Sequence, residues 1–172
     1  MSSFSLEPAS IHDGDDILAM LNEIGRGENG FHNHAYNLTW KEYKAYLNHC
    51  ERNSKGLSLD KGHVQQTTYW FRQDSYPLGV IKLRHELNDS LRRQGGHIGY
   101  SMRPSERGKG YGKVMLQAVL NPARALGLDK VLLTIFISNI ASRKMVERCG
   151  GVLERSEGGI CYYWIELTTS QL

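Results

Sequence analysis

The sequence predicts an α/β fold of the α+β type, in which a mixed, mostly antiparallel, twisted sheet of seven strands carries helices on both faces. Two observations lead to this prediction. Stretches of β-branched and aromatic residues alternate with stretches of helical periodicity in the order β-α-α-β-β-β-α-β-α-β-β. Turn residues also separate a hairpin in the middle of the chain and a second one at its end. The length of 172 residues fits one domain, and we expect residues 1–172 to form it.

Local signals define the first two helices, which follow a short strand at residues 3–6. Asp13 precedes apolar residues at helical spacing, so we expect Asp13 to cap the first helix and Gly25 to stop it. Thr39 and Glu42 have the spacing of a capping box, which predicts a second helix to about residue 49. A polar stretch from residue 53 to 62 then predicts a connector.

The later elements are also marked by turn and breaker residues. The expected strands are residues 64–71, 78–87, 97–102, 130–137, 152–155 and 160–167, and the expected helices begin at residues 111 and 141. The polar, basic stretch at 88–96 predicts a loop. Pro122 lacks an amide hydrogen and its ring disfavours a helical residue before it, so we expect a kink or break there.

Composition restricts the class of protein. Lys+Arg 21 against Asp+Glu 18 gives a net charge of +3, which is too small an excess for a dedicated nucleic-acid-binding surface. Cys50, Cys149 and Cys161 contain no C-x-x-C pair, which indicates a reducing compartment, and we expect Cys149 to be a packing residue. The N-terminus lacks the features of a signal peptide, and the apolar stretch at 131–137 is too short to span a bilayer. We therefore expect a cytoplasmic protein without a membrane partner.

The segment at residues 97–113, H-I-G-Y-S-M-R-P-S-E-R-G-K-G-Y-G-K, predicts an anion site. A strand ends, and glycines open a helix whose first amides have no partner within the helix. Arg107, Lys109 and Lys113 add positive charge, so we expect a phosphate or diphosphate there. A Walker loop is excluded because Val114 follows Lys113, and Lys113 also replaces the third glycine of a dinucleotide-binding fingerprint.

These residues resemble the GNAT acetyltransferase superfamily, whose coenzyme A loop is [QR]-x-x-G-x-[GA]. Residues 107–112 match it without a gap, and Asn139, Ser142 and Gly150 fit the family's second conserved region. The resemblance covers residues 64–167, and the expected order of elements agrees with it. It implies an N-acetyltransferase that moves an acetyl group from acetyl-CoA to a primary amine, by direct attack in a ternary complex.

The resemblance also implies where the donor binds. The strand that carries Tyr100 and Met102 is expected to splay away from the strand that ends near Ile137, and the pantetheine arm would fill the gap. Backbone groups near Met102 would bond that arm and stabilise the oxyanion. The residues implied for cofactor binding are Tyr100, Met102, Arg107, Gly108, Lys109, Gly110, Tyr111, Gly112, Asn139 and Ser142.

The attacking amine must lose a proton, so a base is needed. Many GNAT proteins place a carboxylate just before an Ile on the strand that precedes the loop, and His97 occupies that position here. His97 is therefore the predicted base, with Glu86 and His85 as fallbacks; alternatively, His97 is an ordinary strand residue. Val146 stands where many members carry an acidic Tyr, so the acid is not identified. A non-catalytic acyl-CoA-binding module is the alternative function.

The acceptor amine itself is not identified by the sequence. Residues 31–36 join the two early helices, which wall the acceptor pocket in this family, so they are either a recognition segment or a polar loop. His32 and His34 have no third ligand of matching spacing, so we expect no metal. Arg84, Arg92 and Arg93, together with Lys82, could attract an acidic partner or nucleic acid, but we expect a solvated basic loop. A homodimer is the common default for the quaternary structure.

Overall fold

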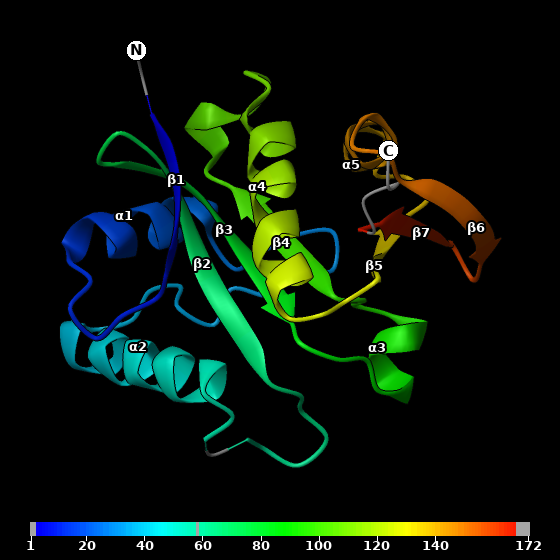
Figure 1. Cartoon of the computed structure of the whole chain (residues 1–172). Coiled ribbons are helices and arrows are strands. Elements are labelled where there is room, and N and C mark those ends of the chain that lie inside the picture. Colours follow the sequence, from blue (N-terminus) through cyan, green and yellow to red (C-terminus); the bar gives the residue numbers. More distant parts are fainter. Residues whose placement is uncertain (1–2, 58, 168–172) are drawn as a thin grey trace.

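The computed structural model describes residues 3–57 and 59–167 (Figure 1). Its strands are β1 (Phe4–Pro8), β2 (Gln66–Gln73), β3 (Tyr76–Arg84), β4 (Ile98–Met102), β5 (Lys130–Phe136), β6 (Val152–Glu157) and β7 (Ile160–Glu166). Its helices are α1 (Asp15–Ile24), α2 (Trp40–Ser54), α3 (Asp89–Arg93), the 3-10 turn η1 (Pro104–Glu106), α4 (Tyr111–Ala125) and α5 (Ile140–Arg148).

The predicted seven strands, antiparallel pairing and helices on both faces are confirmed, with one difference in connectivity. The strands form two hydrogen-bonded sheets, with the orders β1-β2-β3-β4 and β5-β7-β6. Every strand pair in both sheets is antiparallel. The boundary between the two sheets lies between β4 and β5, where the single sheet was expected to splay.

The two sheets are joined at one end of that boundary. The amide of His97 donates to the Leu132 carbonyl at 2.8 Å, and the Leu132 amide donates to His97 Nδ1 at 2.9 Å. Nearby, the amide of Gly95 donates to Thr134 Oγ1 at 2.7 Å. Within the described residues β4 pairs only with β3 and β5 pairs only with β7, so no ladder joins β4 to β5. The strands therefore diverge toward Met102 and leave a wedge between the sheets.

Alternation along β2 and β3 divides the core into two layers. Trp70 and Val80 face α1 and α2, while Phe71 and Ile81 face α4. Figure 1 shows α1 and α2 on one side of the four-stranded sheet and α4 on the other. All four of these side chains are essentially inaccessible to water, and their burial is the main favourable contribution to packing the helices on the sheet.

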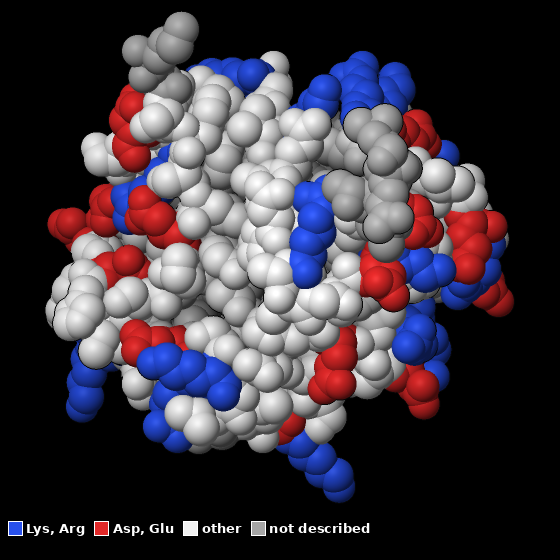
Figure 2. Space-filling model, in the orientation of Figure 1, with Lys and Arg blue, Asp and Glu red and all other residues white. Residues whose placement is uncertain are grey.

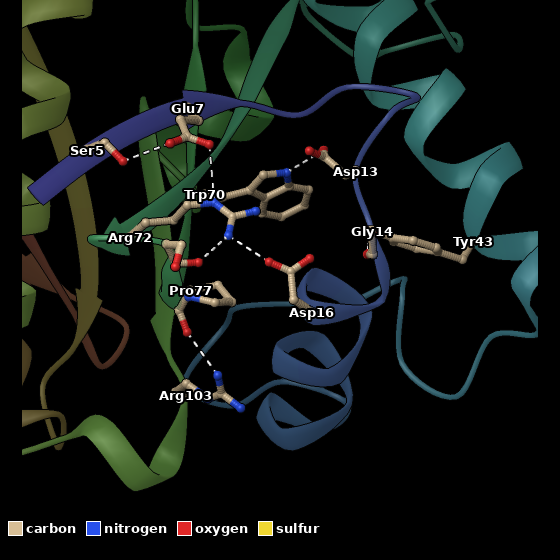
Figure 3. A network of polar contacts seen from close by, with 11 residues as sticks. Ser5, Glu7, Asp13, Gly14, Asp16, Tyr43, Trp70, Arg72, Pro77 and Arg103 are labelled. Carbon is tan, nitrogen blue, oxygen red and sulfur yellow. Dashed lines mark hydrogen bonds and ion pairs between the residues drawn. The ribbon is translucent and has the colours of Figure 1, made fainter.

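The start of α1 differs from the prediction. Gly14, and not Asp13, is the N-cap, and no side chain caps the helix. The Asp13 carboxylate instead accepts from the indole of Trp70 and from the amide of Ser10, both at 2.7 Å. Separately, Arg72 forms an ion pair with Asp16 in the first turn of α1, at 2.6 Å (Figure 3). A buried indole N–H needs an acceptor. The local sequence around Asp13 does not show that a distant tryptophan will use its carboxylate.

The capping box of α2 is confirmed, because Thr39 Oγ1 accepts from the Glu42 amide and Glu42 accepts from the Thr39 amide. The helix continues to Ser54, beyond the predicted end near residue 49. Ser58, in the predicted connector, lies outside the described residues.

Two further expectations were wrong. The predicted loop at 88–96 contains α3, which begins because the Asn88 side chain accepts from the Leu91 amide at 2.9 Å. The helix α4 does not break at Pro122 but continues to Ala125. Pro122 lies in the last turn, so few helical hydrogen bonds are affected, and buried Ala123 holds that turn against the core.

Candidate active site

A cleft of about 1160 Å³ runs through the wedge between the sheets. The glycine-rich loop, which follows Met102, lines one end, the polar end of β3 lines the other, and the α1–α2 connection lines both. Nine of the predicted cofactor-binding residues line this one cleft: Tyr100, Met102, Arg107, Gly108, Gly110, Tyr111, Gly112, Asn139 and Ser142. Lys109 does not line it, and its ammonium pairs with Glu106 at 2.8 Å. We call the end with the glycine-rich loop the donor end.

The glycine-rich loop has the backbone of an anion cradle. Gly108 and Gly110 have φ of 76° and 83°, which disfavour any residue with a Cβ. An added Cβ at either position meets no atom within 4 Å, so the space above the loop is open. Within the described chain the amides of residues 108–110 make no hydrogen bond, and α4 begins immediately after them. These open amides and the helix N-terminus favour a bound anion.

Arg107 fastens this loop to its surroundings. Its Nε donates to the Met102 carbonyl at 3.2 Å, at the end of β4. Its Nη1 forms an ion pair with Glu28, which belongs to the α1–α2 connection. Both side chains are partly exposed, so this pair is accessible to a competing anion.

The middle of the cleft contains an unusual polar group. The Tyr100 hydroxyl is buried and makes no hydrogen bond within the described residues, although Ser142 lies close to it. Burial raises the pKa of Tyr100 to about 12, so the phenol keeps its proton. Across the wedge, Asn139 caps α5 by accepting from the Ser142 amide at 3.3 Å. Buried polar groups are rarely left without a partner, so this site favours a ligand with hydrogen-bonding groups.

His97 lies outside this cleft. Its side chain is 6% exposed, and Nδ1 is occupied by the Leu132 amide. Its ring makes an edge contact with Trp164, with centroids 6.4 Å apart. Together with His85 and Glu86, it lines a separate small hollow. None of the three predicted bases therefore reaches the cleft wall.

The electrostatics of His97 also differ from those of a free imidazole. Burial lowers its pKa to about 4, with a further contribution from Arg92 and Arg84. His85 hydrogen-bonds Thr67 Oγ1 at 2.8 Å, and burial lowers its pKa as well. Both imidazoles are neutral at pH 7, and both are engaged with the protein.

Sequence comparison now identifies the family. The profile described as acetyltransferase (GNAT) domain matches residues 4–152, which is most of the chain. The chain belongs to the GNAT acetyltransferase family. A search of curated proteins found no match. The fold comparison agrees with this assignment, because 124 solved chains are similar to it.

Three of these structures illustrate the shared GNAT fold. RimL, a ribosomal L7/L12 α-N-protein acetyltransferase in complex with coenzyme A, has a TM-score of 0.70 and 15% identity, over 95% of this chain and 94% of RimL. The Campylobacter jejuni N-acetyltransferase PseH in complex with acetyl coenzyme A gives 0.64 and 11%, over 96% and 100%. An N-acetyltransferase from Staphylococcus aureus Mu50 gives 0.65 and 20%, over 97% and 100%.

The position of the usual GNAT tyrosine is structurally informative. Val146 is completely buried in the larger core and does not line the cleft. Cys149 packs partly buried against the same core, and burial raises the pKa of its thiol. Its setting is that of a packing residue rather than a nucleophile.

The other end of the cleft contains residues that the sequence analysis did not single out as catalytic. We call it the acceptor end and define it by Phe31, His34, Lys82, Arg84, Gln66 and Thr68, all of which line the cleft. Burial lowers the pKa of His34, and nearby Lys82 lowers it further. Burial also lowers the pKa of Lys82, to about 8. Lys82 and Arg84 were expected in a solvated basic loop, but they lie on β3 and are partly buried, because their spacing of two residues places them on one face of the strand.

Two weaker expectations concern metals and nucleic acids. The rings of His32 and His34 are 6.5 Å apart, and the described residues contain no group of three His, Cys, Asp or Glu side chains arranged for a metal ion. Figure 2 shows acidic and basic side chains interspersed over the face seen there. None of the described helices combines the length and apolar character required to cross a bilayer.

Proposed function

We propose that this GNAT protein is an N-acetyltransferase that moves an acetyl group from acetyl-CoA to a primary amine, by direct attack in a ternary complex. The observation that carries the proposal is the continuity of the cleft. An anion cradle lines its donor end, and polar side chains of β2, β3 and the α1–α2 connection line its acceptor end. Two substrates bound at these two ends would meet in the wedge, and holding them together would account for much of a rate enhancement.

The residues of the donor end fit the chemistry of acetyl-CoA. The open amides of residues 108–112 would bind the diphosphate, with Lys113 and Arg148 as further cations at the cleft wall. The unpartnered Tyr100 hydroxyl offers a hydrogen bond to the pantetheine arm. Asn139, whose side chain caps α5, lies opposite it. Backbone amides of β4 on the wedge side would stabilise the negative charge that develops on the acetyl oxygen.

We assign proton removal to the acceptor end rather than to His97. His34 lines the cleft, and its lowered pKa keeps it neutral at pH 7, which is the form that accepts a proton. His97 then has a positioning role, because its ring joins β4 to β5 at the closed end of the wedge. Val146, which stands where many GNAT proteins have an acidic Tyr, is a buried hydrocarbon side chain and has no proton to donate. The thiolate product therefore takes its proton from water.

Two measurements test the proposed function. Calorimetry with coenzyme A measures donor binding, and thiol release from acetyl-CoA is followed with a panel of primary amines. Amine-dependent thiol release together with a mass increase of one acetyl group on the amine is the expected result. Donor binding with no amine-dependent release under any condition supports an acyl-CoA-binding module instead. Absence of donor binding contradicts both functions.

A further inference from the structure

We propose that the acceptor amine carries an anionic group, a carboxylate or a phosphate, that Lys82 and Arg84 bind at the acceptor end of the cleft. The inference rests on the proposed function, which it extends by naming a class of acceptor. It arises from the position of two cations on one face of β3 and from the absence, in the part of the chain that the structure describes, of an acidic partner for either.

The register of the sheet places these cations next to the wedge. Lys82 lies opposite Thr68 of β2 on one side and opposite Gly99 of β4 on the other. Residues two apart share a face, so Lys82 and Arg84 continue the face on which Val80 packs against α1 and α2. Where the helices end, the same face becomes polar and forms the floor of the acceptor end. Gly99 has no side chain that could separate Lys82 from the wedge.

Each cation is held in place by the protein backbone. Lys82 Nζ donates to the His32 carbonyl at 3.0 Å and lies 4.7 Å from the centre of the Phe31 ring. Arg84 Nη1 donates to the carbonyls of Gly95 and Gly96, at 3.0 and 3.2 Å. An ammonium has three donors and a guanidinium has five, so both groups retain donors for a ligand.

The acidic side chains of the cleft do not neutralise these cations. Glu28 pairs with Arg107, Glu106 pairs with Lys109, and Asp60 lies 3.7 Å from His63. Within the described residues neither Lys82 nor Arg84 forms an ion pair. Burial of an uncompensated charge is costly, and a bound anion removes that cost. The same cost of burial lowers the pKa of Lys82 to about 8, and at pH 7 the ammonium is still largely protonated.

The diphosphate of the donor does not account for this charge. Lys82 is opposite Gly99, whereas the glycine-rich loop follows Met102, three residues further along β4. At a rise of about 3.3 Å per residue, Lys82 lies about 10 Å from the end of the strand from which the loop departs. The donor end also has its own cations. An anion at Lys82 is therefore expected to come from the second substrate.

The arrangement also assists the chemistry of the amine. A positive charge nearby lowers the pKa of an ammonium group, as Lys82 already does for His34. An acceptor anchored through its anion would place its amine beside this positive field and lose a proton more readily. A polycationic amine would be repelled from the same site, because Lys82 and Arg84 carry positive charge and form no ion pair within the described residues.

The first test compares acceptors that differ in one charge. The pairs are β-alanine with β-alaninamide, for a carboxylate, and glucosamine 6-phosphate with glucosamine, for a phosphate. The expected kcat/KM ratio favours the anionic member of at least one pair by about tenfold or more. Lys82→Met reduces this ratio toward one, and Lys82→Arg restores most of it. Lys41→Met, which removes an exposed lysine outside the cleft, leaves the ratio unchanged. Preference for the neutral members, or for spermidine, overturns the inference.

The second test does not require turnover. The enzyme is saturated with coenzyme A, and its Tm is measured with inorganic phosphate or succinate at constant ionic strength. Stabilisation of the wild type by either anion, and loss of that effect in Lys82→Met, supports the inference. No stabilisation by either anion overturns it. Because coenzyme A binding is measured separately, failure of the anion site is distinguished from failure of the proposed function. A loss of kcat in Lys82→Met that is equal for neutral and anionic amines places Lys82 at the reacting carbonyl and also overturns the inference.

Discussion

The imidazole Nδ1 of His97 accepts the amide hydrogen of Leu132 at 2.9 Å, so a side chain replaces a strand carbonyl where the two sheets meet. The His97 amide completes the pair by donating to the Leu132 carbonyl. This two-bond joint lies at the closed end of the wedge, and the cleft widens from there. His97 thus occupies the sequence position of the usual GNAT base but contributes to the architecture of the cleft.

Acid should weaken the fold through His97. Its pKa is about 4 in the folded protein and about 6.5 when unfolded, so the folded state favours the neutral ring. The stabilisation is complete above pH 6.5 and is lost as the pH falls through 4, by up to about 3 kcal/mol. His97→Asn, which retains an acceptor near Nδ1 but does not titrate, should flatten this part of the curve. Urea unfolding of both proteins from pH 7 to pH 4 measures the difference, and parallel curves would contradict it.

His97→Ala should lower the free energy of unfolding and leave the pH dependence of activity unchanged. Removal of the ring leaves the Leu132 amide buried without a partner, which costs about 1–3 kcal/mol. The pH profile of kcat/KM between pH 5 and pH 9 should keep all its ionisations. The loss of one of them would restore His97 as the base that the sequence predicted.

Gly110→Asp should abolish tight donor binding. The substitution forces a residue with a side chain to φ of 83° and places a carboxylate beside the expected diphosphate. We expect coenzyme A to bind at least about tenfold more weakly in calorimetry. Gly127→Asp is the matched control, because Gly127 has φ of 80° and equally open space but lies at the other end of α4. Equal affinity in the two variants would refute the placement of the diphosphate.

Glu28→Gln should strengthen donor binding. Glu28 occupies the Arg107 guanidinium, which a diphosphate would otherwise contact. Removal of the carboxylate should lower the Kd for coenzyme A at low salt. The expected change is only about two- to fivefold, because an exposed ion pair contributes little free energy. The gain should shrink in high salt. Glu154→Gln, which breaks an ion pair on β6, is the control and should not change the Kd.

His34→Asn should remove the acidic limb of the activity profile. Burial lowers the pKa of His34 from its ordinary value, so wild-type kcat/KM should fall only at a pH below the usual range of an imidazole, where His34 becomes protonated. The variant should be at least about tenfold slower and lack this limb. His12→Asn alters an exposed histidine outside the cleft and should behave as the wild type. An intact limb in His34→Asn would place the base elsewhere.

The donor end was accessible to sequence reasoning because its chemistry is local. A glycine-rich loop that opens a helix depends on neighbouring residues, so an anion cradle at residues 107–112 could be predicted from the local sequence, and the resemblance to the GNAT family implied coenzyme A as its ligand. Gly110 forms the left-handed N-cap of α4, as such a loop requires. The capping box of Thr39 and Glu42 was predictable for the same reason.

The remaining features depend on residues far apart in the chain. The Asp13 carboxylate accepts from the indole of Trp70, which is 57 residues away, and does not cap α1. His97 was identified by its position relative to the loop, but its setting is decided by Leu132 on the other sheet. The net charge of the acceptor end depends on which acidic side chains lie close to Lys82, and the sequence does not show those distances.

The connection between α1 and α2 contributes Glu28 to the donor end of the cleft and His34 to its acceptor end, which we propose to bind the two substrates. A change of amine selectivity made by transplanting this connection from another GNAT protein will therefore alter coenzyme A affinity as well. Engineering of the two specificities independently requires that Glu28 be retained while the residues after Phe31 are exchanged.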